Sequence, residues 1–180
     1  MNHSLRLAFC SMAAALGTVV MILTGFIPVG TYALPAFSGI LLIAVVAEVG
    51  IKWAVGVYVV QSVLSFMLAA DQEAVLFFVL LFGYYPILKA VLESRVHQRW
   101  LCIVSKLVVF NAAAILEFWL SVKLLGVPVA SFSVFGYNVP GLFLLAGNAV
   151  FLIYDYAVSL LVIAYFNRLH PVMKKWFHPK

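Results

Sequence analysis

The last apolar stretch of the sequence, residues 141–168, contains two side chains that could do chemistry in an apolar setting, Asn148 and Asp155. They are seven positions apart, which is two turns of an α-helix, so both would lie on one helix face. A carboxylate at the centre of a bilayer costs about 2.5–3.5 kcal/mol on insertion scales. Asp155 therefore needs either a partner on another helix or a ligand.

The composition places these side chains in a membrane protein. Of the 180 residues, 66% are hydrophobic and 9% are charged, and the mean hydropathy is +1.15. Soluble domains average about 25% charged residues, so a soluble fold of this size could not bury so much apolar surface. The net charge of +5 does not indicate a nucleic-acid partner, because the basic residues form no patch interleaved with aromatic residues.

Polar residues divide the chain into six apolar runs, which predict an all-α integral membrane protein with one domain, residues 1–180. A membrane-spanning helix needs about 20 residues, so the second run is short. The first run is expected to be an uncleaved helix rather than a signal peptide. Tyr84-Tyr85-Pro86 predicts a kink in the fourth helix. The six runs are residues 5–27, 34–49, 51–70, 73–92, 100–125 and 141–168.

Lysine and arginine set the predicted orientation of the six transmembrane helices. With the N-terminus inside, Lys123 is the one basic residue, of the 11 Lys and Arg residues, that lies on the outer side, near Asp71 and Glu73. The positive-inside rule then puts both termini in the cytoplasm.

Two predicted outer loops, residues 28–35 and 126–140, are uncharged and rich in aromatic residues, glycine and proline. Such loops suit a semi-rigid cap over a cavity, although plain interfacial turns would have a similar composition. If they form a cap, Tyr32, Tyr137 and Asn138 are candidate ligand contacts.

Three polar side chains are expected at one depth in the outer half. At about 1.5 Å per residue, Gln61, Glu117 and Asn148 lie roughly 10–13 Å from the outer helix ends. One level of hydrogen-bonding groups is what a ligand pocket would need, and Tyr85 could face the same pocket. The alternative is that these groups bond to each other across helices as packing contacts, which we favour for Gln61 taken alone.

Asp155 is expected deeper, roughly 16 Å from the inner end of its helix, at a level that Asn111 also reaches. The long stem of Lys106 could carry its ammonium to Asp155, and such a pair would satisfy both buried charges. A proton relay or a ligand contact remains the alternative for Asp155. Lys89 and Glu93 are expected to form an ordinary i,i+4 pair, as are Glu48 and Lys52.

The first apolar run has small residues at a spacing of four, which lets another helix approach closely. Cys10 and Cys102 are predicted to be free thiols, and the sequence contains no metal-binding, cofactor-binding or catalytic motif and no phosphate-binding loop. The small residues are Ser11, Ala13, Ala14, Ala15, Gly17 and Thr18.

The first predicted helix is rich in alanine (LAFCSMAAALGTVVMIL), and a proline-containing segment follows it (FIPVGTYALPAFSG). In these two segments, and in its size and topology, the chain resembles the substrate-binding S components of energy-coupling factor (ECF) transporters. The resemblance implies uptake of a vitamin or related micronutrient across the plasma membrane. It further implies that the small residues of helix 1, often an Ala-x-x-x-Ala pattern, dock onto a transmembrane coupling subunit driven by two cytoplasmic ATPases. Here Ser, Gly and Thr replace one member of that pattern.

Two other functions remain open. A small membrane scaffold of the cell-shape or divisome type would use the same helix faces for assembly and would need no ligand. An intramembrane enzyme could use Glu117 and Asp155 for acid–base chemistry, but the two carboxylates are expected at different depths and no nucleophile accompanies them. We therefore expect a binding protein and not an enzyme.

Overall fold

The computed structural model describes residues 3–27, 30–96, 98–128 and 140–171. These residues form helices joined by short turns, without strands, and six helical segments are long and apolar enough to cross a membrane. The prediction of an all-α protein with six potential spans is confirmed. The segments are α1 (His3–Leu23), α2 (Gly30–Glu48), α3 (Ile51–Leu68), the broken helix α4 (Gln72–Phe77), η1 (Phe78–Phe82) and α5 (Tyr85–Arg95), α6 (Arg99–Leu124), and α7 (Pro140–Ala164) with η3 (Tyr165–Leu169).

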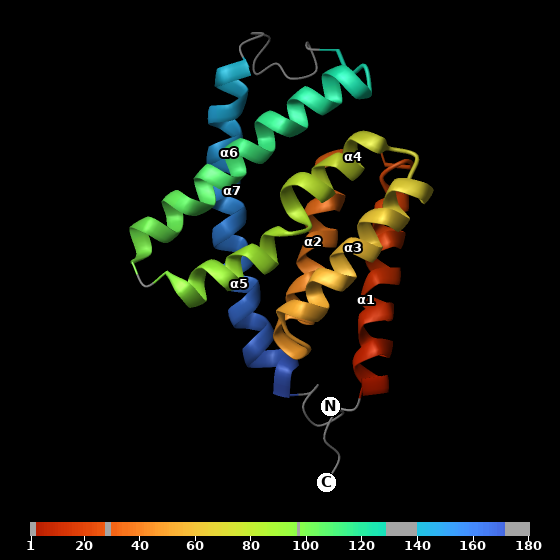
Figure 1. Cartoon of the computed structure of the whole chain (residues 1–180), viewed down its shortest axis with the longest axis vertical. Coiled ribbons are helices and arrows are strands. Elements are labelled where there is room, and N and C mark those ends of the chain that lie inside the picture. Colours follow the sequence, from red (N-terminus) through yellow and green to blue (C-terminus); the bar gives the residue numbers. More distant parts are fainter. Residues whose placement is uncertain (1–2, 28–29, 97, 129–139, 172–180) are drawn as a thin grey trace.

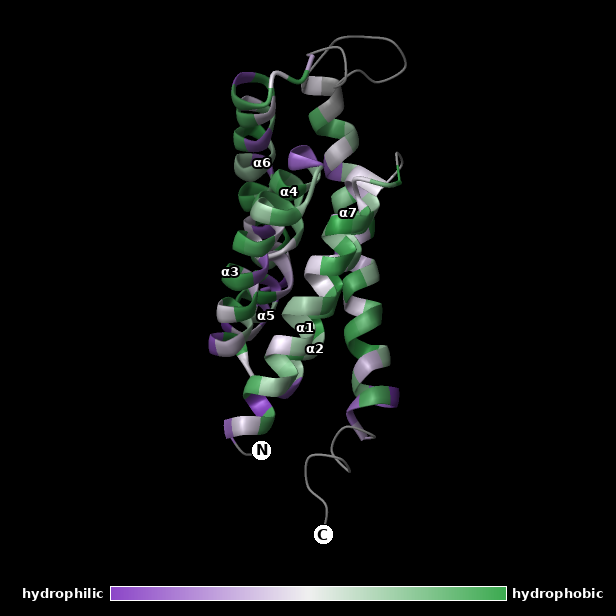
Figure 2. Cartoon of the chain, turned by 90° about the vertical axis from the view of Figure 1, so that its right-hand side faces the viewer, coloured by the Kyte–Doolittle hydropathy of each residue, from purple (hydrophilic) through white to green (hydrophobic). Residues whose placement is uncertain are grey.

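The chain runs up and down between two ends of the molecule. The first helix α1 begins, and η3 ends, at the lower end in Figure 1, while α6 ends and α7 begins at the upper end. Apolar residues cover most of the length of the helices (Figure 2), and many large ones, such as Met12, Leu16 and Trp100, are exposed. In a bilayer, lipid would cover these side chains.

The N-terminal half packs as three close helices. Met21, Leu42, Val45 and Ala54 from α1, α2 and α3 belong to one buried core. Between them runs a chain of polar contacts: the Gln61 amide donates to Ser38 Oγ, and Ser38 Oγ donates to the carbonyl oxygen of Gly17 at 3.1 Å.

Gln61 therefore acts as an interhelical packing contact, the alternative favoured for it from the sequence. Its side chain is completely buried, and a Cβ atom at Gly17 would collide with its amide. The glycine thus leaves room for the Gln61 amide between α1 and α3.

The small residues of α1 are divided between two faces. Ala14, Gly17 and Thr18 are buried in the chain's own packing against α2 and α3, whereas Ser11 and Ala15 are exposed and Ala13 is half-buried. The prediction that all six small residues form one open docking face is wrong. The internal packing uses three of them, because α2 and α3 need the same close approach that a partner helix would need.

The predicted outer loop at residues 28–35 is also corrected. Helix α2 already begins at Gly30, whose N–H donates to the Ile27 carbonyl oxygen at 2.8 Å, and it includes Pro35. A proline inside a helix loses the bond to the carbonyl four residues earlier and crowds that carbonyl, so the apolar packing of α2 overrides this local cost. A tight turn at Gly50, with φ = 98°, separates α2 from α3.

The fourth span is broken, as the Tyr84-Tyr85-Pro86 sequence predicted. The π-helical turn η1 lies between α4 and α5, which run in different directions (Figure 1). A Cβ atom at Gly39 of α2 would lie 2.5 Å from the Phe82 carbonyl oxygen, so the glycine permits close backbone contact there. The Tyr58 hydroxyl donates to the Val79 carbonyl oxygen at 2.8 Å.

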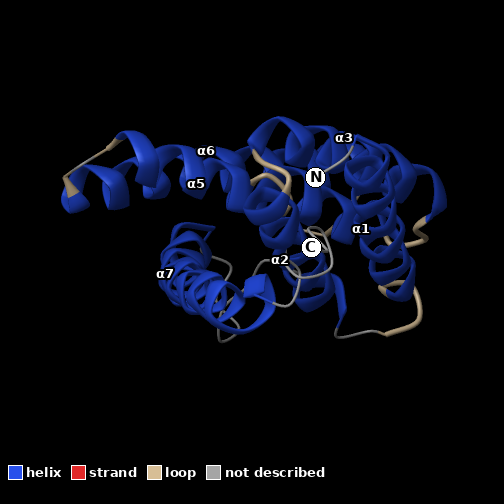
Figure 3. Cartoon of the chain, turned by 90° about the horizontal axis from the view of Figure 1, so that it is seen from below, coloured by secondary structure: helices blue, strands red, loops and turns tan. Residues whose placement is uncertain are grey.

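The last two long helices stand apart from the three-helix core. Seen from below, α7 lies on one side of the molecule, away from α1 and α3 (Figure 3). It is held by a second core in which Phe151 and Val158 of α7 pack with Ile43 of α2 and Tyr85 of α5. This arrangement places α7 beside both halves of the broken fourth span.

Candidate functional site

A cavity of about 700 Å³ lies in the upper half of the molecule. Its walls come from α2, α4, η1, α6 and α7, so four separate stretches of the sequence enclose it. The lining is almost entirely apolar, with aromatic rings on several sides. These rings belong to Tyr32, Phe77, Phe82, Phe110, Phe118, Phe151 and Tyr154.

Glu117 of α6 is the one charged side chain among the described residues that line the cavity. Its side chain is buried, with 3% of its surface exposed. Ser121, one helical turn later, donates its hydroxyl to Glu117 Oε1 at 2.7 Å. The structure thus puts the sequence-predicted carboxylate at the cavity wall, where a bound molecule could reach it.

Tyr32 of α2 lies at the same cavity, as a candidate ligand contact should. Its ring packs edge-on against Phe77, with 4.8 Å between the ring centroids, and about half of its surface is exposed. The carboxylates of Asp71, Glu73 and Glu117 are all close enough to interact electrostatically with its hydroxyl. The upper end of the cavity is therefore a region of negative charge.

Stacked aromatic rings from α6 and α7 form part of the cavity wall. Phe110 and Phe151 stack with 4.3 Å between centroids, and Tyr154 packs edge-on against Phe82 at 5.1 Å. The buried hydroxyl of Tyr154 has no hydrogen-bond partner among the described residues. Because this hydroxyl is buried behind the wall, Glu117 and the half-exposed Tyr32 remain as the described lining residues that offer polar groups to a ligand.

Asn148 does not line the cavity, although the depth count placed it beside Glu117. Its amide is paired with that of Asn111 on α6, and both also donate to carbonyls of their own helices, those of Leu144 and Leu107. The prediction that Asn111 would satisfy Asp155 is wrong. Because α6 and α7 are tilted, the two asparagines meet at a level that counting residues along each helix did not give.

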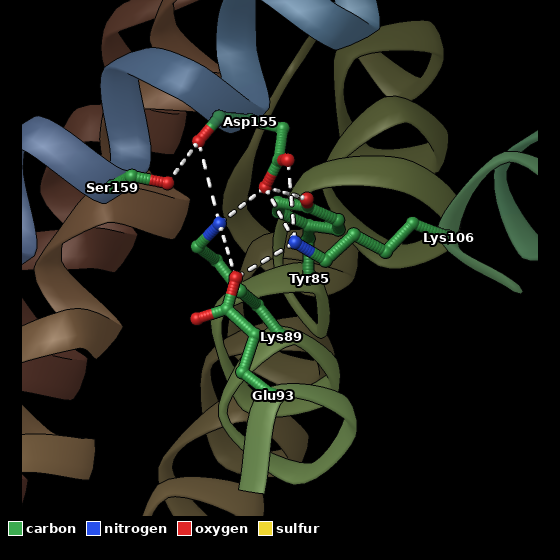
Figure 4. Close-up of polar contacts among 6 residues, drawn as sticks. All are labelled: Tyr85, Lys89, Glu93, Lys106, Asp155 and Ser159. Atoms are coloured by element: carbon green, nitrogen blue, oxygen red, sulfur yellow. Dashed lines mark hydrogen bonds and ion pairs between the residues drawn. The ribbon is translucent and has the colours of Figure 1, made fainter. Parts of the chain in front are cut away.

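Asp155 lies at the centre of a buried charge cluster (Figure 4). Lys106 Nζ is 3.0 and 3.2 Å from its two carboxylate oxygens, so the predicted Asp155–Lys106 pair is confirmed. Lys89 Nζ and the Tyr85 hydroxyl also donate to Asp155 Oδ1. We call Tyr85, Lys89, Glu93, Lys106 and Asp155 the charge cluster.

Glu93 completes the charge cluster by binding both lysines. Its Oε1 atom is 2.9 Å from Lys89 Nζ and 2.8 Å from Lys106 Nζ. The predicted i,i+4 pair between Lys89 and Glu93 is therefore confirmed, but Lys89 is only 4% exposed, so the lysine also reaches Asp155 inside the helix bundle. A sequence signal existed, because Tyr85, Lys89 and Glu93 recur every four residues and so lie on one face of α5.

A further cluster at the lower end replaces the predicted Glu48–Lys52 pair. Glu48 Oε1 accepts a hydrogen bond from Tyr165 at 2.9 Å and lies 2.9 Å from Nδ1 of His170. Glu48 ends α2 and Gly50 breaks the backbone, so Glu48 and Lys52 do not share a helix. Their i,i+4 spacing therefore does not bring the two side chains together on one helix face.

Of the nine candidate ligand residues, the structure thus brings Glu117 and Tyr32 to the cavity. Tyr85 and Asp155 belong to the charge cluster, Asn111 and Asn148 form their own pair, and Gln61 is buried among α1, α2 and α3. Tyr137 and Asn138 lie outside the described residues. Comparison with protein-family models, with curated proteins and with solved structures found no match.

Proposed function

We propose that this chain is the substrate-binding membrane subunit of an ECF-type importer for a vitamin or related small micronutrient. It would lie in the plasma membrane with both termini in the cytoplasm, and so with the cavity in the outer half. A transmembrane coupling subunit and two cytoplasmic ATPases would supply the energy. The sequence itself contains no phosphate-binding loop, in agreement with a subunit that depends on others for ATP hydrolysis.

The observation that carries this proposal is the aromatic cavity with a single buried carboxylate. Its volume of about 700 Å³ falls within the range of roughly 300–1,000 Å³ that is typical of small-molecule sites. Such sites combine apolar walls with a few polar groups that orient the ligand, and Glu117 and Tyr32 fit that description. A scaffold protein without a ligand would have no need of this arrangement.

Native mass spectrometry of the purified chain tests ligand binding directly. We expect a small molecule to be retained through detergent removal, and we expect it to be lost from a variant whose cavity is filled by Gly147→Phe. Retention of the same molecule by that variant would place binding elsewhere. If neither protein retains a molecule under any growth condition that induces the gene, the scaffold function is favoured.

Assembly with a coupling module tests the partner prediction. The exposed Ser11 and Ala15 of α1 are the accessible part of the small-residue face, so Ala15→Trp should prevent co-purification of the coupling subunit. Leu16→Trp is the control, because it exchanges one large exposed side chain for another on the next position of α1. Assembly that is unaffected by Ala15→Trp would contradict docking through α1.

A further inference from the structure

The charges of the cavity say which kind of molecule it would accept. Among the described lining residues, Glu117 alone carries a charge. The two buried lysines, Lys89 and Lys106, are bound to Asp155 and Glu93 in the charge cluster. No cation of the described lining therefore neutralises Glu117, which receives one hydrogen bond from Ser121.

The surroundings of the cavity reinforce its negative charge. Asp71 is fixed near Tyr32, because it accepts hydrogen bonds from the Thr31 hydroxyl at 2.8 Å and from the Ala74 amide at 3.0 Å. Glu73 is near enough to interact electrostatically with Glu117. Charges of one sign around a pocket with low-dielectric walls concentrate ligands of the opposite sign.

The nearby basic residue at the upper end does not cancel this field at the lining. Lys123 places its ammonium over the ring of Trp119, 5.3 Å from the centroid. Trp119 is not a lining residue, and Lys123 itself is exposed. Its charge is therefore largely screened by solvent or lipid headgroups.

The aromatic lining also favours a cation. The faces of aromatic rings carry partial negative charge and attract ammonium groups, an interaction that is strongest where water is excluded. Seven of the residues that line the cavity are aromatic. An anion would face these rings and Glu117 without a counter-charge, which is strongly unfavourable in an apolar site.

From these four observations we infer that the cavity takes a lipophilic monocation, an aromatic or otherwise apolar molecule with one positive charge that pairs with Glu117. This rests on the proposed function, in that the cavity must bind a small molecule at all. Glu117 is the one carboxylate among the described lining residues, so it would balance one positive charge of the ligand. The apolar remainder of the ligand would contact the aromatic rings.

The cavity also reaches the membrane-facing surface. Ile115 of α6 and Val150 of α7 line it, and 59% and 62% of their surfaces are exposed. An apolar cation could therefore enter between α6 and α7 from the bilayer, where such molecules concentrate. The competing occupant is a lipid acyl chain, which has no charge that could pair with Glu117.

The test uses four probes that share one naphthalene ring and differ in charge. They are 2-(aminomethyl)naphthalene, its N,N,N-trimethylammonium analogue, 2-(hydroxymethyl)naphthalene and 2-naphthoate, and equilibrium dialysis of the purified chain against detergent-matched buffer measures binding. We expect both cations to bind at least about tenfold more tightly than the alcohol, and the naphthoate to bind most weakly. Binding of the trimethylammonium compound separates recognition of charge from recognition of an N–H donor.

Variants of two carboxylates then test whether Glu117 causes the preference for the cationic probes. Glu117→Gln should weaken binding of both cations by at least about tenfold, and change binding of the alcohol by less than about threefold. Glu48→Gln, which removes a carboxylate at the lower end of the molecule, away from the cavity, should change all affinities by less than about threefold. Unchanged binding of the alcohol also shows that each variant is folded.

Three results would overturn the inference. Equal binding of all four probes, or cation binding that is insensitive to Glu117→Gln, leaves the proposed function intact and removes only the monocation. Retention of a phospholipid that the cations do not displace identifies an acyl chain as the occupant. Binding of none of the probes, together with no retained small molecule in native mass spectrometry, contradicts the inference and the proposed function alike.

Discussion

Asn111 and Asn148 hold α6 and α7 together through two reciprocal hydrogen bonds, in which each side-chain amide donates to the other's carbonyl oxygen at 2.8 and 2.9 Å. Each amide also donates to a backbone carbonyl of its own helix, at 2.8 Å. All four N–H donors of the pair are thereby used, and no lipid or water is needed to satisfy them. The pair fixes where along their lengths the two cavity-forming helices meet.

Asn148→Leu should lower the free energy of unfolding by about 1–2 kcal/mol, because it leaves the Asn111 amide with an unpaired group in an apolar setting. Asn111→Leu should cost about the same. The double variant should cost less than the sum, since it removes both polar partners at once. Unfolding by SDS titration, followed by circular dichroism, measures the three values. Additive costs would show that the two side chains do not interact.

Asp155→Asn should be one of the most destabilising single substitutions, with a loss of about 3 kcal/mol. It leaves two buried lysines with only the carboxylate of Glu93, and breaking a buried pair on one side strands the opposite charge. Glu93→Gln is the matched control. Because the Glu93 side chain is 49% exposed, its removal should cost about 1 kcal/mol or less.

The same SDS titration tests whether burial, and not the number of ion pairs, decides how much each substitution costs. Each carboxylate contacts both lysines, so an equal cost for both variants would mean that burial does not decide the energy. A smaller loss for Asp155→Asn than for Glu93→Gln would contradict the central place of Asp155 in the charge cluster.

Gly39→Ala should destabilise the fold by about 1–3 kcal/mol, because the added methyl group meets the Phe82 backbone and must push η1 away from α2. Gly56→Ala on α3 is the control, since a Cβ there has no neighbour within 4 Å. It should be neutral or stabilise the helix by up to about 1 kcal/mol. Thermal unfolding in micelles compares the two. A neutral Gly39→Ala variant would mean that η1 yields easily at this contact.

Ser121→Ala should weaken binding of 2-(aminomethyl)naphthalene by about two- to tenfold, without a change in binding of the neutral alcohol. The hydroxyl of Ser121 holds the Glu117 carboxylate by a hydrogen bond of 2.7 Å, and hydrogen bonds to charged groups orient them and stabilise the charge. Equilibrium dialysis measures both affinities. Weaker binding of the alcohol as well would indicate a general change in the cavity instead.

The sequence predicted the elements better than their contacts. Six apolar runs and the kink before Pro86 could be read directly, because length, hydropathy and proline act locally. The start of α2 at Gly30 could not, since it depends on packing that tolerates Pro35. The burial of Ala14 and Gly17 likewise depends on which helix packs against α1. The spacing of small residues does not say whether that helix belongs to this chain or to a partner.

In the candidate site, too, some features could be predicted from the sequence and the contacts between helices could not. Glu117 was found by counting depth from the outer helix ends, and the Asp155–Lys106 pair by asking where a buried charge would find a partner. The pairing of Asn148 with Asn111 was missed because depth was counted along straight, parallel helices, whereas α6 is tilted (Figure 1). Lys89 was assigned to the surface because its i,i+4 spacing to Glu93 was explained without α7, which supplies Asp155.

The π-helical turn at Phe78–Phe82 has a consequence for how the fourth span tolerates changes in length. A π-turn accommodates one residue more than an α-helical path would, so removal of one residue from it would favour a continuous α-helix. Because the π-turn absorbs this extra residue, its removal would leave α5 close to its present phase relative to α4, with Lys89 still facing Asp155. A one-residue deletion elsewhere in α4 or α5 would instead rotate everything that follows by about 100°. The fourth span is thus expected to tolerate the loss of a residue at Phe78–Phe82 better than a loss elsewhere along its length.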